Sequence, residues 1–440
     1  MKLHFFTVND IEDYRIIYPH AQDVKDFKKT FKGRAPKDFD QVFLKWLIRK
    51  LYRFSEETFE SKIYGETGID GLRLDFNFGL RLDVPKGNFY VRVKDADTEK
   101  IFFEKNLSGV RLLSVENYFV RYHVDVFLDG KNIFSHTLNL EGQPVALIEG
   151  ERFVLGDSIS FLPYFREFQR VHRCKLFVRV PEKLRQFAAH LYPDLTFFDQ
   201  KDFDTYATYY LVMVMSPFPI TPCDYRYVSM TRTGGALLGI SYIPPKAIFE
   251  PTAPPVTDEP YVCIAVQATT PFKTWLWPGG WDIVIEYLKQ LGYRVFCIDK
   301  NKEETHEGYT VCMPEGAEDF TGDRPIIERA NMLYHAQFFI GLGSGLSWLA
   351  DAVDCPVVMI AGFSQDWCEF YTPYRVANRN VCNGCFNNPV VNYPSNPCKF
   401  HRGTPREAEC QKEISPIMVI DAIERLIVDR NLTPPLLKNL

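Results

Sequence analysis

The alternation of strand-like and helix-like segments in the C-terminal half of this chain constrains its fold most. The strand-like segments are short and apolar: 261–268, 293–299, 338–343 and 356–362. The segments between them have apolar residues at helical spacing: 280–292, 326–336 and 345–353. Strands that are joined by helices pair in parallel, so this order predicts a doubly wound α/β unit. Ligands of such units bind outside the carboxyl ends of the strands.

A second α/β unit is predicted to precede the first. Its segments 173–181, 182–192 and 208–215 have the patterns of a strand, a helix and a strand. Between the two units, six prolines lie from Pro244 to Pro260, and proline at that density cannot continue a helix or a central strand. We therefore expect an interdomain linker there, with a cleft between the two units.

The pattern before these units changes to short alternating runs separated by turn residues. It predicts an antiparallel β module of six or seven strands between residues 66 and 150. The module is rich in aromatic residues, among them Phe89, Tyr90 and Tyr118. Such rings mark an interface if they are exposed.

The chain is thus expected to divide into four parts. Residues 1–65 form an extension of unknown role with a predicted helix at 39–59. The other parts are the β module and two α/β units, the second of which includes a cysteine-rich segment at 381–412: 66–150, 151–245 and 246–440.

Composition excludes several classes of protein. A net charge of −5 gives no reason to expect non-specific nucleic-acid binding. No apolar run reaches the roughly 18 residues that a membrane-spanning helix needs, and acidic residues come too early at the N-terminus for a secretory signal. Seven of the 11 cysteines are scattered singly, several of them in apolar strand-like runs, as free thiols are. We expect a cytoplasmic protein.

Asp157 is the first candidate site residue. It follows the short apolar run at 153–155 and precedes a helical pattern. At the carboxyl end of a strand, its carboxylate would face the cleft and serve as a proton acceptor. An aspartate at this place is also the type of residue that caps a helix N-terminus, and the two roles do not exclude each other.

A glycine-rich turn is the second candidate. Gly341, Gly343, Ser344 and Gly345 lie between an apolar strand and a helix, where the helix N-terminus offers unpaired N–H groups to phosphate. The spacing is G-x-G-x-G, not the dinucleotide fingerprint G-x-G-x-x-G. A tight strand-to-helix turn without a ligand is the alternative.

The loop after the strand at 261–268 is the third candidate. Lys273 would supply a point charge for a phosphate, with Thr269 and Thr270 as hydroxyl donors; the alternative is a solvated lysine. Three tryptophans would supply flat apolar walls: Trp275, Trp277 and Trp281. Asp323 is a further donor-site candidate, and a turn aspartate is the alternative for it.

Four clustered cysteines indicate a metal site. Cys382 and Cys385 form a C-x₂-C pair, and Cys398 and Cys410 follow. Four thiolates suit a tetrahedral site for zinc or iron, and His401 would be able to replace one of them. A disulfide pair is the alternative, which the other free cysteines disfavour because they indicate a reducing compartment. A metal bound by four protein ligands has no open position for substrate, so it would be structural.

Taken together, these motifs resemble those of the bacterial autotransporter heptosyltransferases, which glycosylate autotransporter adhesins. The resemblance covers about Leu72 to Ile427 and rests on the cysteines and on seven segments: YFVRYHVDVF, GDSISFLPYF, TYATYYL, EPYVCIAVQATT, GAEDFTGD, GLGSGLSWLADA and TPYRV. In the related lipopolysaccharide heptosyltransferases, a G-D pair carries the catalytic aspartate and a D-S-G-x-x-H stretch grips the donor. This chain keeps the first as Gly156-Asp157, but Gly343 and Trp348 stand where the second has its acid and its histidine. That departure fits the autotransporter branch.

The resemblance implies a fold, an activity and partners. The fold is two Rossmann-like domains facing a cleft, of the GT-B type, with a β module before them and a finger that carries iron, or zinc as the alternative. The reaction is inverting transfer of heptose from ADP-heptose to serine, or else threonine, of an adhesin passenger domain by a homo-oligomer as large as a dodecamer. The first α/β unit is then the acceptor side and the second binds the ADP-sugar.

The resemblance also assigns roles to residues. Asp157 is the general base, and Lys273 with the N–H groups of the turn at 344–346 stabilises the departing ADP. The donor site as a whole is Thr269, Thr270, Lys273, Asp323, Gly343, Ser344, Gly345, Leu346 and Ser347. Two other functions remain open: transfer to lipopolysaccharide or another glycan, and a scaffold without catalysis.

Overall fold

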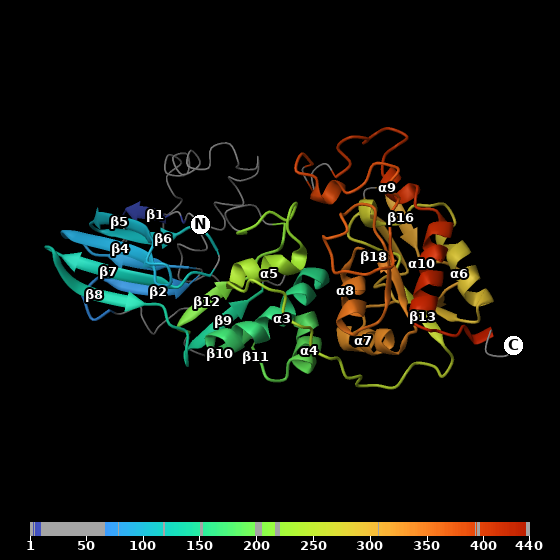
Figure 1. Ribbon diagram of the computed structural model, residues 1–440, viewed down its shortest axis with the longest axis horizontal. Coiled ribbons are helices and arrows are strands. Elements are labelled where there is room, and N and C mark those ends of the chain that lie inside the picture. The colour runs from blue at the N-terminus through green and yellow to red at the C-terminus, as the bar shows by residue number, and fades with distance from the viewer. Residues whose placement is uncertain are drawn as a thin grey trace.

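The computed structural model describes residues 3, 5–9, 67–77, 79–117, 119–149, 153–198, 205–215, 221–306, 308–391, 393 and 397–436. The predicted helix at 39–59 and Tyr118 lie outside these residues. The described chain is a mixed α/β protein with four sheets, arranged along one long axis (Figure 1). No helix of the described chain has both the length and the apolar character that crossing a membrane requires.

One end of the molecule consists of antiparallel strands. A four-stranded sheet has the order β5 (Ile101–Leu107), β4 (Phe89–Asp95), β7 (Tyr122–Leu128) and β8 (Lys131–Thr137). It shares a core with a second row of antiparallel strands: β1 (Phe5–Asn9), β6 (Val110–Ser114), β3 (Arg81–Val84) and β2 (Arg73–Asn77). Buried and partly exposed residues alternate along β4 and β7, as expected of strands with one face on a core. The predicted β module is therefore antiparallel.

Of the three aromatic residues named for this module, the two that the structure describes do not form an exposed surface. The side chain of Phe89 is only 5% exposed and belongs to the core. Tyr90 is half-buried, and its hydroxyl donates to Glu104 at 2.6 Å. The prediction fails at Phe89 because alternate residues of β4 point inward.

The eight-stranded sheet joins this module to the first α/β unit. From β2 it continues in parallel through β12 (Ala207–Tyr210), β9 (Pro144–Ile148), β10 (Lys175–Arg179) and β11 (Thr196–Phe197). Its helices are α3 (Leu155–His172), α4 (Glu182–Leu191) and α5 (Met230–Leu238). Strand β9 lies within the predicted module at 66–150 but pairs with strands of the α/β unit. The first strand of that unit therefore comes earlier in the chain than predicted.

The second α/β unit follows a segment from 240 to 260 that contains neither helix nor strand, in agreement with the predicted linker. Its sheet is wholly parallel: β17 (Glu318–Asp319), β14 (Arg294–Cys297), β13 (Tyr261–Ile264), β18 (Phe339–Leu342), β19 (Val357–Ile360) and β20 (Arg375–Val376). Its helices are α6 (Gly280–Gln290), α7 (Ile326–His335), α8 (Gly345–Ala352), α9 (Glu409–Lys412) and α10 (Pro416–Asp429). A hairpin of β15 (Glu303–His306) and β16 (Tyr309–Cys312) is added to it. The predicted alternation of strands and helices is confirmed.

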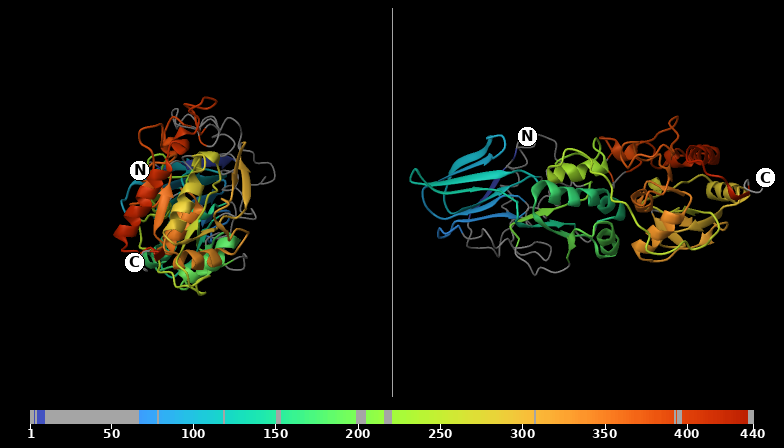
Figure 2. Two further views of the ribbon diagram at one scale, coloured as in Figure 1. Left: turned by 90° about the vertical axis from the view of Figure 1, so that its right-hand side faces the viewer. Right: turned by 60° about the horizontal axis from the view of Figure 1, so that its bottom comes forward.

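The two α/β units meet through helices. Helix α3 packs on α8, and α4 packs on α7, and Figure 2 shows the antiparallel strands and the two units in a row from another side. Lys246 of the linker forms ion pairs with Asp351 at 3.0 Å and Asp354 at 3.2 Å. The linker is thus fastened at the C-terminal end of α8.

Candidate active site

Asp157 lies in the first turn of α3, and not at the end of a strand as predicted. The cap position of this helix is Val154, so the predicted capping role is also wrong. The side chain of Asp157 is 5% exposed, and its Oδ1 accepts the backbone N–H of Val214 at 3.1 Å. Val214 lies in the loop after β12, so the carboxylate is still held at the carboxyl end of the first parallel sheet.

Burial raises the pKa of Asp157 above its ordinary value. The Val214 N–H and the positive charge of Lys273 oppose this rise. Lys273 belongs to the second α/β unit, in the short 3₁₀ helix η1 (Pro271–Lys273) after β13. Two predicted site residues from different units are therefore close enough to interact electrostatically.

The glycine turn lies against the same helix. A Cβ on Gly345 would stand 2.8 Å from the Leu155 side chain, and one on Gly156 would stand 2.9 Å from the Trp348 ring. Glycine at both positions thus allows the N-termini of α8 and α3 to meet. The N–H groups of Gly345 and Leu346, which begin α8 and have no partner within the helix, lie at the end of α3 that carries Asp157.

The predicted strand–turn–helix arrangement of this turn is confirmed, with Ser344 at the cap position of α8. Ser347 is fully buried, and its hydroxyl donates to the Leu342 carbonyl. The Ser347 side chain is therefore already hydrogen-bonded in the protein interior, and only the backbone of Ser347 faces the turn. Gly343 abuts a buried carboxylate, because a Cβ there would lie 2.8 Å from Glu369 Oε1. The ion pair of Glu369 with Arg375, at 3.0 Å, offsets that negative charge.

The remaining predicted donor-site residues differ in their surroundings. Thr270 is buried before η1, and its carbonyl accepts the Lys273 N–H at 3.1 Å, whereas Thr269 is exposed. Asp323 is exposed and forms ion pairs with Lys183 at 3.1 Å and with Lys300 at 4.0 Å. Neither of these two ion pairs involves another predicted site residue.

Trp275 does not form one of the predicted walls. Trp275 is 3% exposed, stacks edge-on against Trp281 at 5.1 Å and donates its Nε1–H to the Ile414 carbonyl at 2.8 Å. Trp277 and Trp281 pack on the core of the second unit. The loop is aromatic because it is part of that core, which a local pattern of tryptophans does not reveal.

Glu149 is a residue of this site that the sequence analysis missed. It directly follows β9 and is fully buried, and neither of its carboxyl oxygens has a hydrogen-bond partner among the described residues. Burial raises the pKa of Glu149 to about 8, and the charge of Asp157 adds to the rise. The Ser158 hydroxyl is near enough to moderate the rise but does not have hydrogen-bond geometry. An acidic residue at the end of the apolar segment 144–148 was the signal for it.

Asp299, also missed, supports the loop that leads to Lys273. It follows β14, and its carboxylate accepts the N–H groups of Val266 at 2.7 Å and Gln267 at 3.3 Å. Burial raises the pKa of Asp299 to about 6, against the effect of these N–H groups. The buried Arg329 donates to the Asp299 carbonyl at 2.8 Å. The path of the loop after β13 is thus fixed by two charged groups.

The four clustered cysteines surround one small cavity, together with His401. No disulfide joins any described cysteine. Burial raises the pKa of the Cys410 thiol, and the other three thiols of the cluster raise it further. Since four close thiols cannot ionise without a cation, this donor set fits a thiolate-binding metal such as iron or zinc.

A second donor set overlaps with the first. One donor atom each from Cys382, His401 and Glu409 lies within 4.8 Å of the others. The Glu409 carboxylate, however, accepts the Cys382 N–H at 3.0 Å and forms an ion pair with Arg406 at 2.6 Å. These contacts commit Glu409 to supporting the cluster, while His401 lines the same cavity as the four cysteines.

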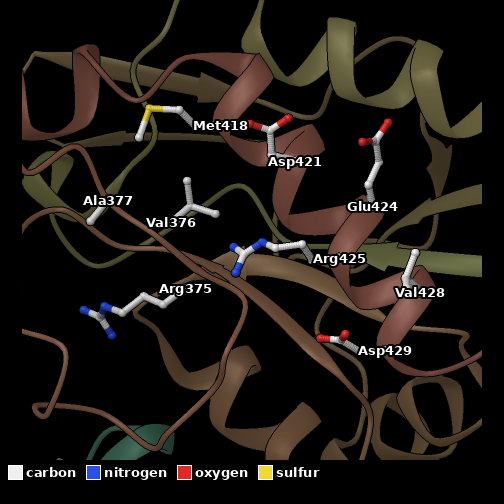
Figure 3. A pocket seen from close by; sticks show the side chains of 9 residues that line it. All are labelled: Arg375, Val376, Ala377, Met418, Asp421, Glu424, Arg425, Val428 and Asp429. Carbon is white, nitrogen blue, oxygen red and sulfur yellow. The ribbon is translucent and has the colours of Figure 1, made fainter.

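A larger cavity is lined by none of the predicted site residues (Figure 3). Its volume is about 730 Å³, and it is lined by β20 and α10 residues of both charges: Arg375, Val376, Ala377, Met418, Asp421, Glu424, Arg425, Val428 and Asp429. None of them is a predicted catalytic, donor-site or metal-binding residue. Size alone does not identify the functional site here.

Two family models match the chain. Residues 68–130 match that of the N-terminal domain of glycosyltransferase TibC, and residues 244–398 match that of glycosyltransferase family 9 (heptosyltransferase). The autotransporter heptosyltransferase BAHTCr of Citrobacter rodentium is 39% identical over 371 residues, which are 82% of this chain and 90% of that protein. The chain belongs to the autotransporter heptosyltransferases.

Other autotransporter heptosyltransferases extend the comparison. The crystal structure of the iron-containing, dodecameric TibC of enterotoxigenic Escherichia coli H10407 matches with a TM-score of 0.80 and 37% identity, over 86% of this chain and all of that one. A structure of TibC in complex with ADP-D-β-D-heptose matches with a TM-score of 0.79 and 36% identity, over 84% and 99%. A Burkholderia thailandensis relative named as an inactive autotransporter heptosyltransferase, BimC, is 33% identical over 82% of this chain and 86% of its own. Family membership alone therefore does not establish activity, and the site residues have to be considered with it.

Proposed function

We propose that this protein transfers heptose from ADP-heptose to serine, or else threonine, hydroxyls of an autotransporter passenger domain, with inversion at the anomeric carbon. The observation that carries the proposal is that Asp157, from one α/β unit, lies within electrostatic range of Lys273, from the other, and on a helix whose N-terminus packs against that of α8. A base on one side and positive groups on the other are what transfer from a nucleotide-sugar requires.

Asp157 acts as the general base. The acceptor hydroxyl oxygen forms a bond to the anomeric carbon, its proton passes to the Asp157 carboxylate, and the bond from that carbon to ADP breaks with its electron pair on the phosphate. The Val214 N–H holds the carboxylate in one orientation. Burial raises the pKa of Asp157 and thus makes it a stronger base than an exposed aspartate.

Lys273 and the first turn of α8 stabilise the leaving ADP. The ammonium group offers a charge to the phosphates, and the N–H groups of Gly345 and Leu346 offer donors together with the positive end of the helix dipole. Thr269 and Thr270 precede Lys273 in the same loop, by four and three residues, and complete this side. Asp323 is the remaining residue of the proposed donor site, and in the structure its carboxylate is paired with Lys183.

The finger at 381–412 binds one structural iron through Cys382, Cys385, Cys398 and Cys410. The donor set described above fits, and TibC is iron-containing. The metal supplies a cross-link for a segment with little core of its own. Four protein ligands leave no position for substrate, so the chemistry of transfer stays with the chain's own residues.

The rest of the architecture follows the same family. We assign the two Rossmann-like domains, facing each other as in GT-B enzymes, to 151–245 on the acceptor side and 246–440 on the donor side, with the strand at 144–148 added to the first. The protein works in the cytoplasm as a ring-like homo-oligomer, for which dodecameric TibC is the precedent.

A scaffold without catalysis is the second candidate, and one observation favours it: a relative 33% identical to this chain is named as inactive. Transfer to lipopolysaccharide or another glycan is the third. Purified protein with radiolabelled ADP-heptose, given either a passenger domain or lipopolysaccharide, separates the three. Label in the passenger domain alone supports the proposal, label in the glycan alone supports the third candidate, and label in neither supports the scaffold.

A further inference from the structure

The loop that carries Lys273 is hydrogen-bonded to the metal finger. The side-chain amide of Gln411, the residue after Cys410, donates to the Phe272 carbonyl at 2.8 Å. The backbone carbonyl of Gln411 accepts the Leu276 N–H at 3.3 Å. These two bonds hold the backbone on both sides of Lys273.

Gln411 is fully buried, and its Oε1 has no partner among the described residues. Burying an amide is unfavourable unless it is hydrogen-bonded, so the bond to Phe272 is the one that this side chain makes. The same junction has a third bond, from the Trp275 indole N–H to the Ile414 carbonyl at 2.8 Å. The loop and the finger therefore cannot separate without losing several buried hydrogen bonds.

The finger also contacts the side chain of Lys273. Its ammonium lies 5.5 Å from the ring centre of Phe386, which follows Cys385, and the face of an aromatic ring attracts a cation at such a distance. One end of the finger thus holds the Lys273 backbone and the other faces its charge.

We propose that Gln411 is a positioning residue for the donor-phosphate site. Through its hydrogen bonds, the folded metal finger holds Lys273 in place. The inference rests on the proposed function, because that function assigns Lys273 to ADP. In the proposed function the finger stabilises only its own segment. The present inference adds that full affinity for ADP requires an intact finger, because the hydrogen bond of Gln411 links the finger to the Lys273 loop.

The test is Gln411→Met in the full-length protein. Methionine keeps the length and apolar volume of the side chain but cannot donate to Phe272. We expect ADP affinity, measured by calorimetry, to fall about 2- to 10-fold, the worth of one hydrogen bond, with unchanged metal content by elemental analysis. The matched control is Asn378→Ala. The Asn378 amide donates to the carbonyl of Glu413, the residue directly after the finger, at 2.7 Å. Among the described residues it has no hydrogen bond to the Lys273 loop, so its loss should leave ADP affinity unchanged.

A double-mutant cycle with Lys273→Ala shows whether Gln411 acts through Lys273. If it does, adding Gln411→Met to Lys273→Ala weakens ADP binding little further; an equal loss in both backgrounds overturns the inference. Wild-type affinity in Gln411→Met with full metal content overturns it too, while leaving the role of Lys273 intact. If Lys273→Ala itself binds ADP normally, the inference and the proposed donor site fail together.

Trp275→Phe provides an independent variant at the same junction, should Gln411→Met not fold. It removes the bond to Ile414 and keeps a ring in the core. The inference predicts weaker ADP binding that disappears in the Lys273→Ala background. Unchanged affinity in Trp275→Phe contradicts the idea that this junction positions the lysine.

Discussion

Burial raises the pKa of the Asp157 carboxyl, and the ammonium group of Lys273, on the other α/β unit, opposes that rise. One side chain is the proposed base and the other is the proposed phosphate ligand. The electrostatic coupling between them means that the acid–base chemistry and the donor site are not independent.

The pH profile should therefore respond to Lys273. Lys273→Met removes the positive charge, so the pKa of Asp157 should rise further and a smaller fraction should be ionised at a given acidic pH. The acid limb of log kcat/KM should move to higher pH, since a general base must be ionised to accept the proton. Lys302→Met, at an exposed lysine paired with Asp319, should leave the limb in place. An acid limb that does not move in Lys273→Met would show that the two groups are not coupled during turnover.

ADP affinity should depend on the same lysine. Lys273→Ala should weaken ADP binding by about 1.5–3 kcal/mol, the usual range for a charge-assisted hydrogen bond, because the contact is to phosphate. Calorimetry with ADP alone measures this directly. If ADP bound normally and only ADP-heptose bound more weakly, Lys273 would contact the sugar and its assignment would be wrong.

The buried Glu149 should make stability depend on pH. In the native state its pKa is about 8, against an ordinary value of 4.5, so the native state binds more protons between these values. The free energy of unfolding should then fall as pH rises from about 4.5 to about 8. Glu149→Gln has no ionisable group there, so it should be more stable than the wild type at pH 8, by up to a few kcal/mol at about 1.4 kcal/mol per pKa unit.

Urea unfolding at pH 5, 6.5 and 8 measures this effect. The advantage of Glu149→Gln should shrink toward pH 5, where the native and unfolded carboxyls are closer in protonation. The same substitution at the exposed Glu315 should give no such trend. A stability difference for Glu149→Gln that is constant across the three pH values would mean that Glu149 is ionised in the native protein.

The cysteine cluster should bind one metal per chain. Iron in a four-thiolate site absorbs visible light and zinc does not, so the spectrum of the purified protein identifies the metal. Cys398→Ser should release the metal and expose the segment from about 381 to 415 to proteases. The affinity of the wild type for the metal should fall at acid pH, because the thiols must lose protons to bind it. Release by His401→Ala but not by Cys410→Ser would establish a site of three cysteines and one histidine.

Much of the fold could be predicted from periodicity, because parallel strands and their helices each leave a regular apolar pattern. The linker could be predicted from its prolines. The shared eight-stranded sheet could not, since strands such as β9 and β12 pair with residues distant in the sequence. For the same reason the predicted boundary at residue 150 lies after a strand of the first α/β unit.

The site was predicted in part. Lys273 and the glycine turn follow strands and could be found from that position, and the proximity of Asp157 to them agrees with the cleft that was expected. Val214 contributes only its backbone, which leaves no trace in the type of residue. Gln411 and Asp299 act through neighbours in the fold, so no local motif marks them, whereas Glu149 had a signal that was overlooked.

The most direct test of the central claim is intact-mass analysis of an autotransporter passenger domain co-expressed with this protein or with Asp157→Asn. Asparagine keeps the shape of the side chain but accepts no proton, and loss of a positioned base costs about 10²–10⁴ in turnover. The account predicts that the passenger domain gains whole heptose increments with the wild type and none or traces with Asp157→Asn, while both proteins bind ADP equally. An unmodified passenger domain with the wild type, or full modification with Asp157→Asn, would contradict it.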